Sequence, residues 1–345
     1  MLKIITVPPG QPCAAWDRYV ADHPAGSGYH LLAWRRVMVE AYGSTTFCFM
    51  ATESNGTVRG VLPLVLLSSR VFGRVLVSMP FVNYGGILTD TPEAKDALLR
   101  AAIEAAREHR AEHVELRQSS VLDVDLPVRQ HKVSMRVELT KDFDTLWERF
   151  PSKLRSQIRR AQKAQMTVTI GREELLDDFY GLLVRNMRDL GSPVHGRRVF
   201  ERFLTALPDE TRICLVSMNT QPMAAGLLYG FRDVLEIPWA AADRRHKELS
   251  ANMLLYSAAL EFGCRAGYRV FDFGRSSPGS GTHRFKEQWG ARPLALHWYY
   301  WLRHGGALPE LAPDNPRFRL AVDLWKRLPL SLTRVLGPAI VKNVP

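Results

Sequence analysis

Residues 271–293, FDFGRSSPGSGTHRFKEQWGARP, place an acid near the end of a predicted buried strand, and hydroxyl groups and several strong cations just beyond it. The carboxylate of Asp272, near the strand end, is a candidate general base. A loop of glycine, serine and proline follows, and then a segment patterned as a helix. Candidates for binding an anionic partner are Arg275, Ser276, Arg284 and Lys286. The alternatives are that Asp272 only caps the loop and that the cations lie on a solvated helix face.

A second group of cations lies at residues 152–164, SKLRSQIRRAQKA, where five lysines and arginines occur without an acid. The spacing predicts a helix with one apolar face. Arg155, Arg159 and Lys163 align at i, i+4 spacing along a different face of this helix. This stripe is either a solvated face or a phosphate-contacting rim of a cleft. Two aromatic residues, Trp239 and Tyr84, are candidates for a substrate wall, with core packing as the alternative for Trp239.

Several well-known catalytic signatures are absent from the sequence. There is no GxSxG elbow, no GxxxxGK[ST] loop, no HExxH pair and no strand-linked GxGxxG. The four cysteines lie far apart without a CxxC pair, and the ten histidines lack ligand spacing. We therefore expect neither a bound metal nor a tightly bound cofactor.

The composition describes a folded protein with a strong positive charge. A length of 345 residues suggests two domains of ~150 residues each. The formal net charge of +11 favours phosphate-rich partners, namely nucleic acid, nucleotide-linked substrates or an anionic membrane face. No apolar run of about 18 residues predicts a membrane span, and the first residues lack a secretory pattern. The expected location is therefore cytoplasmic.

The order of predicted elements occurs twice along the chain. In the first half, helical segments within 11–43 precede three strand-like runs, a helix at 92–110 and strands at 112–117 and 132–139. In the second half, helices at 173–190 and 197–207 precede three strands and a helix at 247–266. The strand YRVFDFG, a short helix and one last strand, PLALHWYYW, complete that half. This repetition predicts an α/β protein with two like domains.

The last thirty residues, 316–345, predict a basic amphipathic helix followed by an apolar stretch broken by proline. Such a tail either lies on an anionic membrane or packs on its own protein, and packing is the more common arrangement.

Four stretches, given in chain order, resemble the FemAB-type transferases, which are built on the GNAT acyltransferase fold. They are SKLRSQIRRAQKAQMTV, FYGLLVRNMRDLGSPVHGRRVFERFL, AAADRRHKELSANMLLYSAALEFGCRAGYRVFDFG and THRFKEQWGA. PFVNYGGILTD at 80–90 and WKRLPLSLTRVLGP in the tail resemble the subgroup associated with PEP-CTERM/exosortase exopolysaccharide systems. The resemblance covers essentially the whole chain. It implies tandem GNAT-like lobes at 1–140 and 141–304, and a helical tail at 305–345.

The resemblance implies an enzyme that transfers an acyl or aminoacyl group to an amine or hydroxyl of an envelope polysaccharide or cell-wall precursor. The acceptor would be a nucleotide- or lipid-linked sugar, and the donor aminoacyl-tRNA or acyl-CoA. Lys286 matches the lysine of the family's FK pair, which would polarise a carbonyl or contact a donor phosphate. Arg159 would reach the same cleft from the basic helix. A location peripheral to the inner membrane, through the tail, fits this function.

One departure bears on the donor. GNAT enzymes that use acetyl-CoA hold its pyrophosphate on a glycine-bearing turn at a helix N-terminus. The equivalent stretch here, RRHKELSANM at 244–253, has no glycine, and Glu248 and Leu249 would obstruct the approach of phosphate to the backbone. Aminoacyl-tRNA is therefore the favoured donor. An acyl-CoA-dependent enzyme and a catalytically silent polyanion-binding module are the alternatives.

Overall fold

A computed structural model describes residues 2–69, 73–309 and 316–344. Contacts within the chain define two compact units. The first unit comprises Met1–Lys132, Ala295–Glu310 and Lys342–Pro345, and the second comprises Val133–Leu294 and Leu311–Val341. In the part of the chain described, no helix is both long and apolar enough to cross a bilayer.

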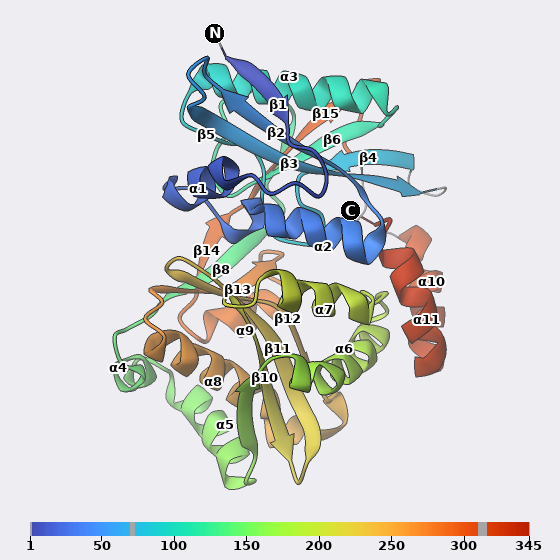
Figure 1. Cartoon of the computed structure of the whole chain (residues 1–345). Helices are drawn as coiled ribbons and strands as arrows, with labels where there is room; N and C mark the ends of the chain where they lie inside the picture. The colour runs from blue at the N-terminus through green and yellow to red at the C-terminus, as the bar shows by residue number, and fades with distance from the viewer. Residues whose placement is uncertain (1, 70–72, 310–315, 345) are drawn as a thin grey trace. The chain divides into compact units, whose positions relative to one another are not determined.

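The first unit is built on a sheet of strand order β1-β2-β3-β4-β6-β15-β7, with β5 paired to β3. Helix α3 lies across one face of this sheet, and α1 and α2 lie across the other (Figure 1). The strands are β1 (Lys3–Thr6), β2 (Thr45–Thr52), β3 (Val58–Ser69), β4 (Gly73–Val77), β5 (Leu88–Thr89), β6 (His113–Gln118), β7 (Val128–Arg129) and β15 (His297–Leu302). The helices are α1 (Ala14–Asp22), α2 (Leu32–Tyr42) and α3 (Pro92–Glu108).

The second unit is built on a sheet of order β14-β8-β13-β12-β11-β10-β9. Its strands are β8 (Val133–Glu138), β9 (Thr167–Gly171), β10 (Thr211–Met218), β11 (Gln221–Phe231), β12 (Val234–Ala242), β13 (Val270–Ser276) and β14 (Arg292–Ala295). Its helices are α4 (Phe143–Glu148), α5 (Ser152–Lys163), α6 (Leu176–Leu190), α7 (Arg197–Ala206), α8 (Ala251–Arg265), α9 (Gly281–Glu287), α10 (Pro316–Arg327) and α11 (Leu330–Val341).

Helix α8 is buried because it is apolar on nearly every side. One side packs on the sheet, and the other is covered by Leu154, Ile158 and Ala161 of α5, all in the same core. The cations of α5 therefore lie on its outer surface, as its sequence pattern predicts. Helices α6 and α7 cover the opposite face of this sheet (Figure 1).

The two sheets follow the same plan position by position. Reading the second sheet from β9, its order β9-β10-β11-β12-β13-β8-β14 matches that of the first sheet from β1. In each sheet the fourth and fifth strands are parallel, β4 with β6 and β12 with β13. The predicted duplication of the fold is thus present at the level of sheet topology.

The sixth strand of each sheet comes from the other half of the sequence. Strand β8, predicted at 132–139 to close the first half, instead pairs antiparallel with β13 of the second unit. The single predicted strand PLALHWYYW is two strands separated at Leu296: β14 joins the second sheet, and β15 pairs with β6 of the first. These two assignments were wrong because a local hydrophobicity pattern predicts a strand without identifying the strand that it pairs with. Each unit therefore combines segments from different parts of the sequence, whereas the predicted limits 1–140, 141–304 and 305–345 are continuous.

The tail forms two helices, both of which contact α6. Gly191 at the end of α6 leaves room for Val322 of α10, and Gly337 of α11 lies against Val194. The stretch expected to be broken by proline is helical instead, and Pro338 lies within α11. The first tail side chains, at 316–318, lie outside the described side chains.

Candidate active site

The parallel strands β12 and β13 separate part-way along their length. They pair over only three positions, ending at Glu236 opposite Asp272, although β12 continues to Ala242 and β13 to Ser276. A bulge between Asp272 and Arg275 bends β13 at this point. Gly274 supplies the positive φ of 77° that the bulge requires. The strand ends therefore diverge and leave backbone groups that no neighbouring strand satisfies.

Asp272 is fully buried where the strands separate. Its carboxylate accepts hydrogen bonds from Ser134 Oγ at 2.6 and 2.8 Å, from Arg136 Nε at 2.8 Å and from the Gly274 amide at 2.7 Å. Ser134 and Arg136 both belong to β8, the strand from the first half of the sequence. These contacts favour the structural role of a carboxylate that holds the bulge, and the general-base role stays a prediction.

Lys286 lies on α9, which Ser280 caps by accepting a hydrogen bond from the His283 amide. Its Nζ donates to the carbonyl oxygens of Gly274 and Arg275, each at 2.9 Å. Burial lowers the pKa of Lys286 to about 8, with the Asp272 carboxylate opposing the shift and the Arg275 charge adding to it. Because an ammonium group has three N–H donors, one remains for another acceptor.

Ser276 ends β13 beside these carbonyls and is 4% exposed. Its Oγ is buried without a hydrogen-bond partner among the described residues. A buried hydroxyl without a partner is unusual in a folded protein and is expected to find one in a bound molecule or a water. This fits its predicted role in substrate binding.

A neutral histidine faces the same region, and the sequence did not identify it. His195, between α6 and α7, is buried, and burial together with the charge of Arg275 lowers its pKa to about 4. Its ring lies edge-on to Trp239 of β12, with centroids 6.0 Å apart. Trp239 also packs on Phe200 of α7 at 5.3 Å. The imidazole is therefore uncharged at neutral pH and is held beside a cation and an indole.

The predicted site residues divide into two groups. Asp272, Arg275, Ser276 and Lys286 lie together at the end of β13, and Arg275 acts electrostatically on His195, which contacts Trp239. The other four predicted residues make different contacts. Arg284 donates to the Gly279 carbonyl at 2.7 Å, and the Arg159 guanidinium lies 5.6 Å from the Trp147 ring centre. Arg155 is half-buried on α5, and Tyr84 is buried against Tyr29 in the first unit. Within the described residues, no hydrogen bond or ion pair joins Arg159 or Arg284 to the Lys286 cluster.

The loop between β12 and α8 is the other feature of this site. It forms a short 3₁₀ segment, Arg244–Leu249, and Asp243 caps it by accepting from the amide and guanidinium of Arg245. Ser250 adopts a left-handed φ of 61° before α8 begins. From α5, the Arg160 guanidinium donates to the Glu248 carbonyl at 3.3 Å. The basic helix thus lies beside the N-terminus of α8.

The corresponding place in the first unit is filled by the protein itself. Beyond Val77 of β4, the Ser78 amide donates to the Glu115 carbonyl, and Ser78 Oγ accepts from the Arg117 amide. The buried Arg117 pairs with Glu115 at 2.6 Å, and its guanidinium lies 4.3 Å from the Trp298 ring centre. These contacts keep the backbone after β4 joined to β6, whereas β12 and β13 separate, so we place the candidate site in the second unit.

A family model described as the acetyltransferase (GNAT) domain matches residues 148–287, which include the whole candidate site. These residues are thus similar to the GNAT acyltransferase domain over about two fifths of the chain. The predicted acyltransferase activity is confirmed at this level. No curated protein sequence matches the chain.

Three solved structures show the same fold at low identity. FemX is 15% identical with a TM-score of 0.66, covering 90% of this chain and 99% of its own. The C-terminal domain of a putative lysylphosphatidylglycerol synthetase from Agrobacterium fabrum is 12% identical with a TM-score of 0.56, over 82% and 90%. A tandem GNAT protein from the clavulanic acid biosynthesis pathway is 14% identical with a TM-score of 0.55, over 89% and 100%. The predicted α/β class with tandem GNAT-like sheets is confirmed.

The β12–α8 loop does not fit the usual phosphate cradle of the GNAT domain. A cradle needs small residues and free amides at the helix N-terminus. Here Glu248 and Leu249 carry side chains, the Glu248 carbonyl is engaged by Arg160, and Ser250 is held in a left-handed conformation. Within the described residues no cluster of side chains suited to a metal ion occurs either.

Proposed function

We propose that this chain is an acyl- or aminoacyl-transferase of the FemAB type that acts on an amine or hydroxyl of an envelope polysaccharide or cell-wall precursor. The main support for the proposal is that β12 and β13 separate and that Lys286 donates hydrogen bonds to two carbonyls at the end of β13. The GNAT domain match and the fold likeness to FemX support the reaction class.

In the proposed reaction, the donor's acyl carbonyl lies between the strand ends. The acceptor nitrogen or oxygen attacks the carbonyl carbon, a new amide or ester bond forms, and the bond to the donor's leaving oxygen or sulfur breaks. The remaining N–H of Lys286 and the Arg275 guanidinium stabilise the negative charge on the carbonyl oxygen. His195 takes the proton from the attacking group and returns it to the leaving group, because its imidazole is neutral at the start.

We propose aminoacyl-tRNA as the donor in preference to acyl-CoA. The side chains of the β12–α8 loop obstruct the cradle that coenzyme A uses, whereas the exposed cations of α5 suit a long phosphate backbone. Binding of acyl-CoA in another manner is the alternative, and the GNAT domain match favours it.

We propose a nucleotide- or lipid-linked sugar as the acceptor, and PEP-CTERM/exosortase exopolysaccharide synthesis in the cytoplasm as the setting. The resemblance of PFVNYGGILTD at 80–90 and of the tail sequence to that subgroup supports the setting. The net charge of +11 suits an acceptor that carries a diphosphate.

The donor is tested by following thermal unfolding with acetyl-CoA, with aminoacyl-tRNA and with uncharged tRNA. Ligand at about 100 times its Kd adds about 2.7 kcal/mol of stability, which is readily measured. We expect aminoacyl-tRNA to stabilise the protein and acetyl-CoA to leave it unchanged. A shift with acetyl-CoA alone would reverse the donor assignment.

The activity itself is tested by transfer of a radiolabelled amino acid from tRNA into nucleotide-sugar and lipid-linked fractions of a cell extract. Lys286→Met should abolish incorporation while tRNA binding persists. If both charged and uncharged tRNA bind equally and no label is transferred to any fraction, the chain is a polyanion-binding module and the proposed enzyme is excluded.

A further inference from the structure

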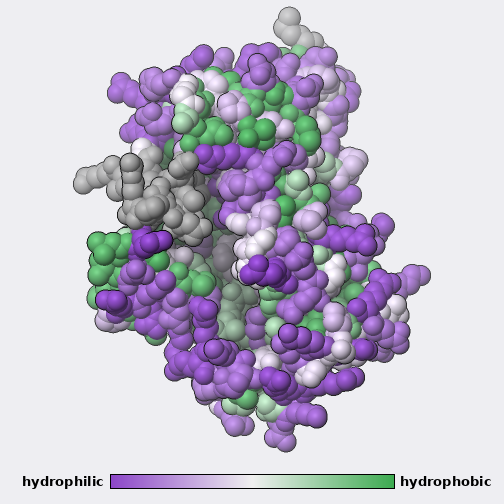
Figure 2. Space-filling view, turned by 180° about the vertical axis from the view of Figure 1, so that it is seen from behind, coloured by the Kyte–Doolittle hydropathy of each residue, from purple (hydrophilic) through white to green (hydrophobic). Residues whose placement is uncertain are grey.

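The two tail helices expose an apolar surface that their packing does not use. Leu320 is 74% exposed and Val335 72%, and four further apolar side chains are exposed with them. We call these six residues the tail face: Leu320, Leu324, Leu332, Val335, Leu336 and Ile340. Green colour gathers over α10 and α11 at the left edge of the space-filling view (Figure 2). Contiguous apolar surface of this kind marks an interaction site.

On α11, Leu332, Val335 and Leu336 of the tail face lie away from the surface by which the helix is anchored. Thr333 and Gly337 are buried, and a Cβ on Gly337 would come within 2.9 Å of the Val194 backbone. Leu332, Val335 and Leu336 recur at helical spacing on the other side of α11. Because Gly337 admits so close an approach, α11 cannot turn its apolar stripe inward without losing this contact. The exposure of the tail face follows from the packing of α11.

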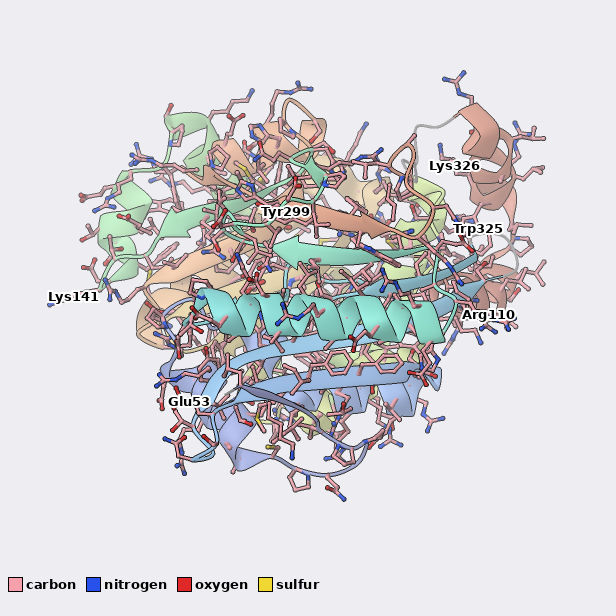
Figure 3. The ribbon with its side chains drawn as sticks, turned by 90° about the horizontal axis from the view of Figure 1, so that it is seen from above. Glu53, Arg110, Lys141, Tyr299, Trp325 and Lys326 are labelled. Atoms are coloured by element: carbon pink, nitrogen blue, oxygen red, sulfur yellow. The ribbon has the colours of Figure 1, made fainter. Side chains whose placement is uncertain are left out.

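Cations border the tail face. Arg319, Lys326 and Arg327 of α10 are all exposed, whereas the Arg334 guanidinium of α11 lies 5.5 Å from the Tyr180 ring centre on α6. The one acid among the described tail residues, Asp323, lies 3.8 Å from Lys326. Trp325 and Lys326 mark this part of α10 in Figure 3. An apolar stripe with a cationic border complements a surface that is anionic outside and apolar beneath.

We propose that the tail face docks on the surface of an anionic phospholipid bilayer, with α10 and α11 lying in the plane of the interface. Each helix has twelve residues, too few to span a hydrocarbon core that needs about twenty. The apolar side chains enter the boundary between headgroups and acyl chains, and the cations pair with lipid phosphates. Docking would hold the enzyme beside lipid-linked material, and it does not depend on the transfer chemistry proposed above.

The test is co-sedimentation of the full chain with vesicles of phosphatidylglycerol and phosphatidylcholine, and with vesicles of phosphatidylcholine alone. We expect binding to the anionic vesicles only, weakening as salt rises. The variant Leu332→Ser/Val335→Ser/Leu336→Ser should lower the partition coefficient at least tenfold. The matched control, Val121→Ser/Val128→Ser/Val168→Ser, removes three exposed valines from strands and loops elsewhere and should bind as the parent does.

Thermal unfolding and sedimentation velocity complete the test. Equal unfolding midpoints for the parent and both variants exclude loss of folding as the cause. Failure of the parent to bind anionic vesicles, or equal binding by the tail-face variant, overturns the proposal. A concentration-dependent dimer that the tail-face substitutions dissociate also overturns it, because the face would then belong to a second copy of the chain.

Discussion

At the scale of single residues, the Lys286 ammonium group binds the carbonyl oxygens of Gly274 and Arg275 and also carries the charge proposed to act in the reaction. Its folded pKa of about 8 is below the ordinary 10.5, so the cation is lost as pH rises through 8. If the cation stabilises the carbonyl oxygen, transfer from aminoacyl-tRNA should fall above pH 8. Lys286→Arg should keep part of the activity and move this decline to higher pH, because guanidinium stays charged. Rates of label transfer between pH 6 and 10 measure the residual activity of Lys286→Arg and the pH at which each protein loses activity. If the activity of Lys286→Arg declines at the same pH as that of the parent, the charge of Lys286 does not act in the reaction.

His195 has a matched control in the other unit. Burial lowers the pKa of both His195 and His30 to about 4, from 6.5. Between pH 4 and pH 6.5 these histidines bind more protons in the unfolded protein than in the folded protein. Each histidine therefore contributes stability that is present above pH 6.5 and lost as pH falls toward 4. His195→Gln and His30→Gln should each flatten the fall in unfolding free energy by up to about 1.4 kcal/mol per pH unit.

Transfer activity separates the two histidines. His195→Gln should lower the rate of label transfer by about 10²- to 10⁴-fold, the usual contribution of a general base. His30 donates or accepts only within the first unit, at Ser27 and the Gly86 carbonyl, so His30→Gln should leave the rate within a few fold. Equal rates for the two variants would assign His195 a packing role only.

At the scale of elements, α5 presents a stripe of cations that packing does not explain. If Arg155, Arg159 and Lys163 contact three tRNA phosphates, replacing all three by Gln should reduce the slope of log Kd against log salt by about 2. The control replaces the exposed Arg18, Arg100 and Arg107 by Gln, which gives the same change in charge on α1 and α3. Filter binding of tRNA at several salt concentrations compares them. Equal slopes would show that only the total charge matters.

Most helices and strands of this chain were predictable because their apolar spacing is local. The run VLEIPWAAA forms β12 over the residues predicted, and α3 begins at Pro92 behind the Thr91 cap. The partners of β8 and β15 were not predictable. Strand β8 alternates in hydrophobicity and strand β15 is a run of aromatic residues, and neither pattern identifies the sheet that the strand joins.

The candidate site was predictable in part for the same reason. Asp272, Arg275, Ser276 and Lys286 are close in sequence, so a strand, a loop and a short helix bring them together. His195 lies far from them in sequence, and a single histidine carries no signal that burial will keep it neutral. The placing of Arg159 and Arg284 in the same cleft stays a prediction. Their contacts, with the Trp147 ring and the Gly279 carbonyl, could not be predicted because sequence does not determine where a long side chain points.

At the scale of the whole molecule, the exchange of β8 and β15 makes each sheet depend on both halves of the sequence. Strand β8 completes the second sheet and donates to Asp272 through Ser134 and Arg136. Strand β15 completes the first sheet, where the Tyr299 hydroxyl accepts from the Leu122 amide. An Asp272 left buried without β8 would be an uncompensated charge, which is costly.

This dependence predicts the behaviour of a chain cut in two. Lys141 is exposed just after β8, and it projects from the molecule in Figure 3. Fragments 1–140 and 141–345, expressed together, should co-purify as a folded pair, because each holds the sixth strand of the other's sheet. Expressed alone, each should be insoluble or unfolded by circular dichroism. Fragment 1–130, which lacks β8, is the control and should fail to rescue 141–345. Independent folding of 141–345 would mean that the second sheet does not need β8. The contacts of β8 with Asp272 would then not be needed to hold the bulge at Gly274 or to place Lys286.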